Sequence, residues 1–313
     1  MRHAQALLLL LLALAACATP PGHRVLTQGN GKLLILDRQN NIEWQMPWGG
    51  IHDLHLLPSG NIMVQQGAGK VVEIDRHTKQ VVWQYDSHSQ NGNKGKPVEV
   101  HAFEPLPNGR LMIAESGPAR IIEVDRNGTL LSETKLKVDH PHPHTDTRLV
   151  RMITNDHYLV CHEGDGFVRE YEQGTGRVVW EYKVPMFGRE PKGGHGLNAF
   201  GNKCFAALRL DNGNTLIATG NGHSIIEVTR AGEVVWQITQ NELQDIRLAW
   251  VTTLELLPNG NLVIGNCHAG PGQPLLVEVS RPSKKVLWRL DQFDLLGNSV
   301  PNSQLIDVEG SVR

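Results

Sequence analysis

The sequence predicts an all-β fold, a six-bladed β-propeller of four-stranded antiparallel blades whose ring is closed by the C-terminal strand. Three observations predict it. A unit that reads as one four-stranded sheet occupies 51–85 and returns, diverged, at nearly regular intervals. Its turn residues and a tryptophan recur at fixed places in the copies. An incomplete unit begins the repeats and a lone apolar strand ends them. Self-similarity at such a period is typical of repeat architectures, propellers among them.

The unit at 51–85 contains four strand signals in order. An apolar run ends in the turn Leu-Pro-Ser-Gly-Asn, and NIMVQQ, KVVEIDR and VVWQY follow as second, third and fourth strands. Alternation of apolar and polar residues, with β-branched and aromatic side chains, suits a pleated sheet. One such sheet cannot bury both of its faces, so it must pack against its copies.

The second and third strands recur as paired signatures in four further copies. The pairs are RLMI with IIEVDR, HYLV with VREYEQ, NTLI with IIEVTR, and NLVI with LVEVSR. The turn before the second strand is LPSGN, LPNGR, LDNGN or LPNGN, and ITNDH at 153–157 is a diverged version. The sequence therefore holds five full units.

A sixth blade is expected from the two ends of the repeat region. Residues 23–46 hold a second, third and fourth strand but no first strand, and NSQLIDVEG at 302–310 is an apolar strand with no partner after it. If the late strand completes the early sheet, a ring of six sheets closes with few free edges. We therefore expect a single propeller domain over 24–313.

The first residues are similar to a bacterial lipoprotein signal. A short basic start and a leucine-rich run, too short for a membrane span, lead to Leu14-Ala15-Ala16-Cys17, which matches the lipobox. We expect 1–16 to be a signal peptide, Cys17 the lipidated residue that attaches the chain to the membrane, and 17–23 a short tether. Ala18, by resemblance to Gram-negative lipoproteins, favours the outer membrane. The alternative is an ordinary secretory signal with an incidental cysteine.

Charge and cysteine content exclude two classes of protein, those that bind nucleic acid through a basic surface and those held together by disulfides. The net charge is −2, which offers no basic field for nucleic acid. Besides Cys17, the chain has Cys161, Cys204 and Cys267, an odd number that does not describe a disulfide scaffold. Cys161 and Cys204 lie in adjacent repeats, and geometry decides whether they pair.

Two repeated residue types are expected to be structural. Five tryptophans fall on fourth strands and should pack between neighbouring sheets: Trp44, Trp83, Trp180, Trp236 and Trp288. A glutamate recurs on the third strands, as Glu73, Glu123, Glu170, Glu227 and Glu278. Trp250 differs because it ends a long loop, so it either packs or faces a ligand.

The repeats resemble those of the pyrroloquinoline-quinone-enzyme-like (PQQ-like) and arylsulfotransferase-like propeller families. HTKQVVW and TGRVVW are similar to the quinoprotein repeat, and HDLHLLPSGN is similar to the arylsulfotransferase-like repeat that bears a histidine. The second resemblance implies a channel histidine as sulfate carrier, His52 or His101 here, with Arg148 holding the anion. Quinone binding is not expected, because the adjacent-cysteine pair and two further blades are lacking. The anchor and repeats also resemble the propeller lipoprotein of the outer-membrane barrel-assembly machinery, which implies a protein partner.

Candidate site residues come from sorting the sequence by face. In a propeller the first strands line the channel, and the connections that enter them lie on the same face as the hairpins between second and third strands. Four long connections fall there, at 86–98, 138–147, 184–203 and 240–251. Long loops on one face of a rigid scaffold commonly carry function. We call this the loop face. Nine of the 15 histidines are assigned to it: His52, His101, His140, His142, His144, His162, His195, His223 and His268.

Histidine binds metals and transfers protons near neutral pH. We expect catalytic roles for His52, His101, Arg148 and His162, with His101 and Arg148 lining solvent, and ligand contacts from Gln66, Glu115, His144, His195, Trp250, Asn266 and His268. For any single histidine the alternative is a solvated loop residue or a hydrogen bond between blades. A divalent metal is a further possibility, because HPHPHT could place His140, His142 and His144 on one side of an extended segment. No metal ligand is assigned.

The expected function is that of an envelope-anchored propeller, an outer-membrane lipoprotein facing the periplasm or the outside. Its histidine-rich pocket would bind a small anionic or carbohydrate-like ligand, and catalysis is left open. The alternatives are a non-catalytic protein-binding scaffold and an arylsulfotransferase-like or lyase-type enzyme. A site for chemistry requires histidine and arginine side chains to converge on one point. A scaffold requires exposed hydrophobic or charged edges.

Overall fold

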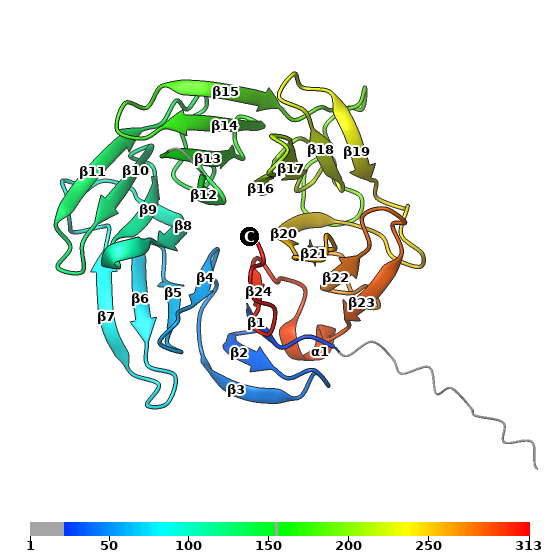
Figure 1. Cartoon of the computed structure of the whole chain (residues 1–313), viewed down its shortest axis with the longest axis horizontal. Helices are drawn as coiled ribbons and strands as arrows, with labels where there is room; N and C mark the ends of the chain where they lie inside the picture. The colour runs from blue at the N-terminus through cyan, green and yellow to red at the C-terminus, as the bar shows by residue number, and fades with distance from the viewer. Residues whose placement is uncertain (1–21, 154–155) are drawn as a thin grey trace, which may run out of the picture.

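The computed structural model describes residues 22–153 and 156–313. Six four-stranded antiparallel sheets stand around a central axis, each with its first strand innermost, which confirms the predicted six-bladed propeller (Figure 1). The first blade consists of β24 (Ser303–Leu305), β1 (Val25–Gly29), β2 (Lys32–Leu36) and β3 (Ile42–Pro47). The second consists of β4 (Leu54–Leu56), β5 (Ile62–Gln66), β6 (Lys70–Ile74) and β7 (Val81–Asp86).

The four remaining blades repeat this order from the inside outwards. The third has β8 (Glu99–Pro105), β9 (Leu111–Ser116), β10 (Arg120–Val124) and β11 (Leu130–Lys135), with the short 3-10 turn η1 (Pro107–Gly109) after β8. The fourth has β12 (Val150–Ile153), β13 (His157–His162), β14 (Phe167–Glu172) and β15 (Val178–Lys183). The fifth has β16 (Ala206–Arg209), β17 (Thr215–Ala218), β18 (Ile225–Val228) and β19 (Val234–Ile238). The sixth has β20 (Trp250–Leu256), β21 (Leu262–Cys267), β22 (Leu276–Val279) and β23 (Val286–Leu290), followed by α1 (Phe293–Leu296).

Closure of the ring follows the prediction. Strand β24 pairs antiparallel with β1, in a register that sets Val25 opposite Leu305. Leu305 is buried in a cluster that joins the first blade to Val263 and Leu276 of the sixth. Residues from the two ends of the described chain therefore complete one sheet and one interblade core.

The fourth-strand tryptophans join neighbouring blades, as predicted. The indole N–H of Trp44 donates to the carbonyl of Arg76 at 2.7 Å, and that of Trp83 donates to the carbonyl of Arg126 at 2.7 Å. Trp180 and Trp236 make the same bond to Arg230 and Arg281, both at 3.0 Å. Each indole thus holds the turn between the third and fourth strands of the next blade.

The repeated glutamates are also structural. Glu227, for example, accepts a bond from Asn214 in its own blade at 2.7 Å and pairs with Arg281 of the next blade. The others also bond both within their own blade and to the next one: Glu73 with Asn61 and Arg126, Glu123 with Arg110 and Tyr158, Glu170 with His157, Arg209 and Arg230, and Glu278 with Asn261 and His23. A partly buried charge is stable here because it is paired on both sides.

The structure bears on cysteine pairing and on membrane-spanning helices, but not on the signal peptide. Cys161, Cys204 and Cys267 are buried free thiols, and burial together with the neighbouring Cys204 raises the pKa of Cys161. Within 22–153 and 156–313, no helix has the length and apolar character to cross a bilayer. The signal peptide and Cys17 lie outside the described residues, so they stay predictions.

Candidate functional site

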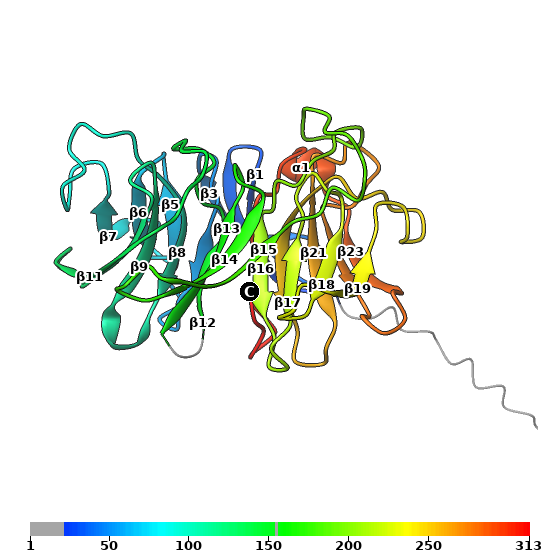
Figure 2. The ribbon, with the colours of Figure 1, turned by 90° about the horizontal axis from the view of Figure 1, so that it is seen from above.

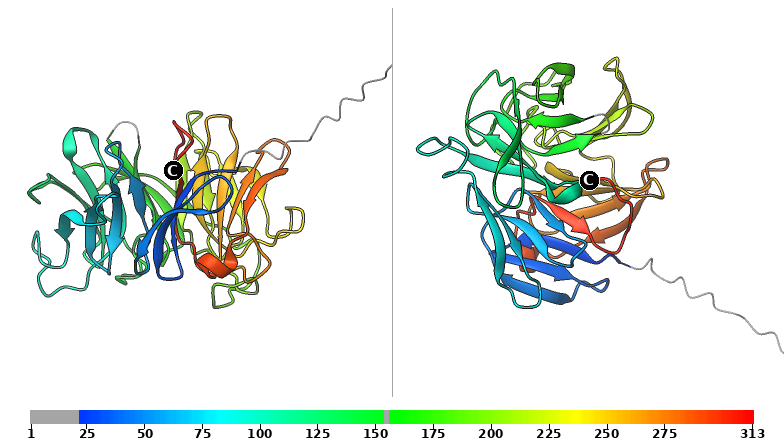
Figure 3. Two further views of the ribbon diagram at one scale, coloured as in Figure 1. Left: turned by 90° about the horizontal axis from the view of Figure 1, so that it is seen from below. Right: turned by 60° about the vertical axis from the view of Figure 1, so that its left-hand side comes forward.

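The loop face carries the long connections that the sequence predicts. In the view from above, the β7–β8 and β15–β16 connections and α1 extend from the same side of the ring (Figure 2). The view from below shows α1 on one side and the C-terminal segment towards the other (Figure 3). The described chain begins on the side of the C-terminal segment, opposite the loop face, because Gly22 lies against Arg38 in the β2–β3 turn.

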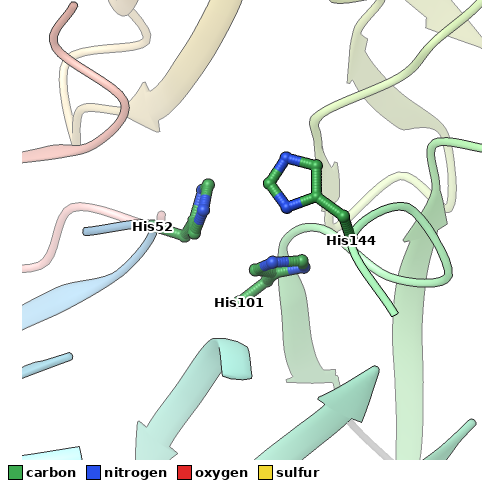
Figure 4. Close-up of side chains that lie close together, drawn as sticks. All are labelled: His52, His101 and His144. Carbon is green, nitrogen blue, oxygen red and sulfur yellow. The ribbon is translucent and has the colours of Figure 1, made fainter. Parts of the chain in front are cut away.

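Three histidines from separate segments of the chain meet near the axis on the loop face, and we call them the histidine cluster (Figure 4). His52 precedes β4, His101 lies in β8, and His144 lies in the β11–β12 connection. One ring nitrogen of each lies within 4.8 Å of the others. The ring centroids are 4.4 Å apart for His52 and His101, and 5.3 Å for His101 and His144.

Two histidines of the cluster, His52 and His101, are held by hydrogen bonds to neighbouring segments. The backbone N–H of His52 donates to Gln65 Oε1 at 2.7 Å, and Asn302 Nδ2 donates to its carbonyl at 3.1 Å. His101 Nδ1 lies 2.8 Å from the carbonyl oxygen of Thr147. A register irregularity in β8 between Val100 and Ala102 sets the His101 position. The backbone of His52 and the ring of His101 are therefore held in place.

Glu99 connects two of the three rings. Its Oε2 lies 3.0 Å from His101 Nε2 and 2.7 Å from His144 Nδ1. Hydrogen bonds from His101, followed by those from His144, lower the pKa of Glu99 to about 2. At neutral pH the cluster therefore contains one carboxylate.

Burial makes the rings of His52 and His101 reluctant to take a second proton. It lowers the pKa of His52 well below its ordinary value, and the charges of His101 and Arg148 act in the same direction. It also lowers the pKa of His101, against the hydrogen bond to Glu99. Neutral imidazoles accept protons and bind metal ions.

Arg148 contributes a buried cation beside the cluster. Its Nε donates to Glu163, its guanidinium lies 5.7 Å from the Phe205 ring centroid, and its buried Nη1 has no hydrogen-bond partner among the described residues. The expectation that His101 and Arg148 line solvent is wrong, because the two residues are 1% and 5% exposed.

A second group of predicted residues meets across the same face. His195 lies 4.5 Å from the Trp250 ring and 5.1 Å from the His268 ring, measured between centroids. Trp250 is buried against Phe205 and Cys267, so it packs while its ring edge meets His195. Cys267 Sγ lies 2.9 Å from His268 Nδ1, but burial raises the pKa of this thiol to about 11. The thiol is therefore protonated at neutral pH.

Four predicted site residues do not belong to either group of histidines. Three of them make structural hydrogen bonds or ion pairs, and the fourth is exposed. His162 is fully buried, with Nδ1 2.6 Å from the Asp146 carbonyl oxygen and Nε2 2.8 Å from the Tyr171 hydroxyl. Glu115 pairs with Arg120, and Asn266 bonds to three backbone groups of its own blade. Gln66 is exposed at the end of β5, and the preceding Gln65 points inwards instead.

The HPHPHT segment separates its three histidines. His140 Nδ1 lies 3.1 Å from Asp165, and His142 Nδ1 accepts the backbone N–H of His144 at 3.1 Å. Only His144 reaches the cluster. The two intervening prolines do not align the rings, so the segment does not form a metal site by itself.

Sequence reasoning missed Glu99, although a signal existed. In the stretch VEVH, Glu99 precedes His101 by two residues, and residues two apart on a strand share a face. The spacing of two residues therefore could have indicated this carboxylate, although the register irregularity at His101 interrupts the regular alternation of β8.

The sequence also gave no sign of a charged network at the other end of the channel. The Asp53 carboxylate accepts two bonds from Arg151, at 2.7 and 2.9 Å, and lies 3.4 Å from Arg313. Burial opposes ionisation of Asp53, but the Arg151 charge outweighs it and holds the pKa well below its usual range. A cavity of about 310 Å³ opens beside Arg151 and Arg313 and includes Glu104 and His55. It is separate from the histidine cluster.

Similarity to solved structures supports the fold. A protein of unknown function from Bacteroides caccae matches at 23% identity, with 90% of this chain and 98% of that chain covered and a TM-score of 0.73. Streptogramin B lyase matches at 13% identity over 88% of this chain and 84% of that one, with a TM-score of 0.55. A catalytically inactive histidine-to-alanine variant of virginiamycin B lyase from Staphylococcus aureus, with quinupristin, matches at 13% identity over 88% and 86%, with a TM-score of 0.52.

The family assignment comes from the sequence. A search of curated proteins finds no match. The family model described as outer membrane protein assembly factor BamB matches residues 29–290, which span blades two to six and strands β2 and β3 of the first blade. The chain therefore belongs to this family of PQQ-like β-propellers.

Proposed function

We propose that this chain is an envelope-anchored propeller that binds a small anionic or carbohydrate-like ligand at the histidine cluster on its loop face. The observation that carries the proposal is the convergence of three imidazoles from separate segments of the chain beside the buried Arg148. A binding site requires such convergence, whereas surface histidines of a scaffold have no reason to meet.

Unpaired polar atoms at the cluster support a ligand. His52 Nδ1 and Arg148 Nη1 are buried and have no hydrogen-bond partner among the described residues. A buried polar group without a partner costs about 1–3 kcal/mol. An anion that accepts from Arg148 and contacts the rings would offset that cost in the bound state.

The same groups suit proton transfer on a bound anion. A guanidinium neutralises a carboxylate or sulfate, and a neutral imidazole accepts a proton from an adjacent carbon or hydroxyl. Two of the similar structures are lyases, and in one of them a histidine-to-alanine variant is catalytically inactive. We therefore include lyase-type catalysis in the proposal.

Binding can be tested by calorimetry with defined anions. Glucuronate, N-acetylglucosamine 6-sulfate and 4-nitrophenyl sulfate are titrated into the purified protein and into the His144→Ala variant. His144 is half exposed, so its loss should leave the fold intact while weakening binding at least 10-fold. His140→Ala in the same loop is the matched control and should bind as the unaltered protein does. Equal affinities for the two variants, or no binding of any probe, would contradict the proposal.

The anchor can be tested separately. Replacing Cys17 with Ser removes the thiol that a lipid would modify. The variant should move from the membrane fraction to the soluble envelope fraction, as judged by fractionation and blotting. A variant that stays with the membrane would contradict lipid attachment at Cys17.

A protein-binding scaffold is a second candidate, favoured by the outer edges of the blades. The fourth strands carry exposed apolar pairs, with Val82 in β7 55% exposed, Leu131 in β11 50% exposed and Val235 in β19 54% exposed. Open strand edges with apolar residues can accept a strand from a partner. The family description names outer membrane protein assembly, which such a surface would serve.

Complementation distinguishes the two candidates. A strain lacking the gene is supplied with the Val82→Lys/Val235→Lys double variant or with His144→Ala, and β-barrel proteins in the outer membrane are quantified. A scaffold predicts a loss with the edge variant alone. Normal levels with the edge variant would contradict this candidate.

A further inference from the structure

We propose that His52, His101 and His144 bind one divalent transition metal ion of the zinc type, with the Glu99 carboxylate beside it. This inference rests on the proposed function only in placing the anionic ligand at the same end of the channel. The ion itself can be measured without any ligand.

The distances suit a single ion. The three ring nitrogens lie within 4.8 Å of one another. Zinc binds histidine nitrogen at about 2.0–2.1 Å, so its ligand atoms end roughly 3.0–3.4 Å apart. Small rotations of the rings close this difference, and the exposed His144 on its loop has the freedom to rotate.

Hydrogen bonding around His101 leaves a place for a cation. Nδ1 faces the Thr147 carbonyl oxygen and Nε2 faces Glu99 Oε2, and both of these oxygens accept. A neutral imidazole carries one N–H, so it can satisfy only one of them. If Nδ1–H bonds to Thr147, the Nε2 lone pair faces the carboxylate, and a cation bound at Nε2 beside the carboxylate would offset this repulsion.

This pattern alone does not identify a metal site. His223, inside the fifth blade, also lies between two carbonyl oxygens, those of Ala249 and Ala199. The histidine cluster differs in two ways. The second acceptor of His101 is a carboxylate shared with His144, and His52 Nδ1 is buried nearby without any partner among the described residues. These atoms surround one point, whereas the His223 carbonyls belong to the backbone.

The arrangement around His101 matches that of metal-binding histidines in general. Such a residue usually donates its other ring N–H to a carbonyl or carboxylate, which fixes the ring and the tautomer. Thr147 supplies this carbonyl. The Thr147 position is itself fixed, because its N–H donates to Ser116 Oγ at 3.0 Å and its hydroxyl lies 3.1 Å from the same atom.

The donor set selects the class of ion. Three imidazole nitrogens with a carboxylate favour zinc and its neighbours over magnesium and calcium, which prefer oxygen ligands. His144 is 49% exposed at its side chain, so one side of the ion would remain open to solvent or substrate. Three protein ligands with an open position are typical of catalytic rather than structural zinc. Such an ion would polarise an anion whose remaining charge faces Arg148.

Metal binding is tested on the full-length protein, purified in detergent and treated with a chelator. Zinc chloride is titrated by calorimetry, and cobalt chloride is followed by its visible absorption, which reports the coordination geometry. The proposal predicts one ion per chain. His144→Ala should weaken zinc binding at least 100-fold and remove the cobalt spectrum. Glu99→Gln should weaken it by about 10- to 100-fold.

Two controls make the result decisive. His140→Ala removes an exposed histidine of the same loop and should change neither affinity nor spectrum. Circular dichroism of each apo-variant checks that the fold is kept. Binding at less than one equivalent, or identical affinities for His144→Ala and His140→Ala, would overturn the proposal. A hydrogen-bonded cluster that shares a proton at Glu99 would give this second result.

The experiments can contradict the metal-binding proposal and the anion-binding proposal independently. If zinc does not bind but the metal-free protein still binds glucuronate or sulfate esters through the cluster, the proposed function stands and the metal inference falls. If zinc binds in the predicted way and no anion does, the reverse holds.

Discussion

His162 and His144 show how burial divides the histidines of this protein. His162 is fully buried and has a partner at each ring nitrogen, whereas the side chain of His144 is half exposed and its ring faces two other imidazoles. The first arrangement stabilises the contact between β13 and the β11–β12 connection, and the second leaves ring atoms available to a ligand. His144 lies in the connection that leads into the fourth blade, and His162 lies in strand β13 of that blade, 18 positions later in the sequence.

Stability should depend on pH through His162. Burial lowers its pKa to about 4 in the folded protein, against 6.5 for an unperturbed histidine. The unfolded chain therefore binds the proton first as pH falls. The contribution of neutral His162 to the free energy of unfolding is therefore fully present above pH 6.5. It falls by about 3 kcal/mol as the pH decreases from 6.5 to 4.

The measurement is urea unfolding from pH 7 to pH 4. His162→Gln should make the free energy of unfolding less dependent on pH in this window, whatever it does to stability at pH 7. His140→Gln alters an exposed histidine and should leave the slope as it was. An unchanged slope for His162→Gln would show that its pKa is ordinary. His55, also buried with a pKa lowered to about 4, supplies a similar slope that neither variant removes.

For single residues, the sequence predicts the face of the propeller on which a histidine lies better than it predicts the residues that the histidine contacts. His52, His101 and His144 come together as expected of loop-face residues. The contacts of His162 depend on Tyr171 and on the Asp146 carbonyl in a neighbouring connection, which repeat alignment does not order. Gln66 was misplaced because a one-residue shift along a strand moves a side chain to the opposite face.

The repeating element, the blade, is joined to the next blade by an indole and a glutamate. The third blade departs from this rule, because Ser132 stands opposite Glu123 where the other blades have tryptophan. Polar contacts replace the indole there: the Tyr158 hydroxyl donates to Glu123 at 2.7 Å, and the Gly174 N–H donates to Thr134 Oγ1 at 2.8 Å. The sequence predicts the tryptophan positions, but these substitute contacts become visible only when the blades are placed side by side.

Trp83→Phe tests the interblade bond. The change removes the N–H that donates to Arg126 and weakens the stacking of the Arg126 guanidinium, whose centre lies 4.3 Å from the indole centroid. We expect a loss of about 1–2 kcal/mol in the free energy of unfolding. Val82→Thr changes the adjacent, outward-facing residue and should stay within about 0.5 kcal/mol. Urea unfolding measures both, and equal effects would contradict a specific role for the indole.

The whole molecule depends on a single closing strand. The repeat count and the unpaired 302–310 segment were sufficient to predict the ring, because strand edges in a propeller must find partners. The sequence could not predict the Asp53, Arg151 and Arg313 network, since it joins residues that are 98 and 260 positions apart. Such contacts depend on how six inner strands converge, which no single repeat encodes.

Leu305→Asp should therefore destabilise the entire ring. Leu305 is 1% exposed, and an unpaired carboxylate in the core between the first and sixth blades costs several kcal/mol. Val312→Asp makes the same chemical change at a side chain that is 49% exposed and should have little effect. Thermal unfolding followed by circular dichroism compares them. A similar melting temperature for both variants would mean that β24 is not needed for closure.

The position of His23 has a consequence for how the protein would stand in the envelope. The Nε2 atom of its imidazole lies 2.9 Å from Glu278 Oε2, and its Nδ1 atom lies 3.6 Å from Asp307 Oδ1. These contacts are on the side of the propeller opposite the loop face. With a lipid on Cys17, this side would lie towards the bilayer. The mouth bordered by His52, His101 and His144 would then open into the aqueous compartment, so its ligand would arrive by diffusion through water rather than along the membrane.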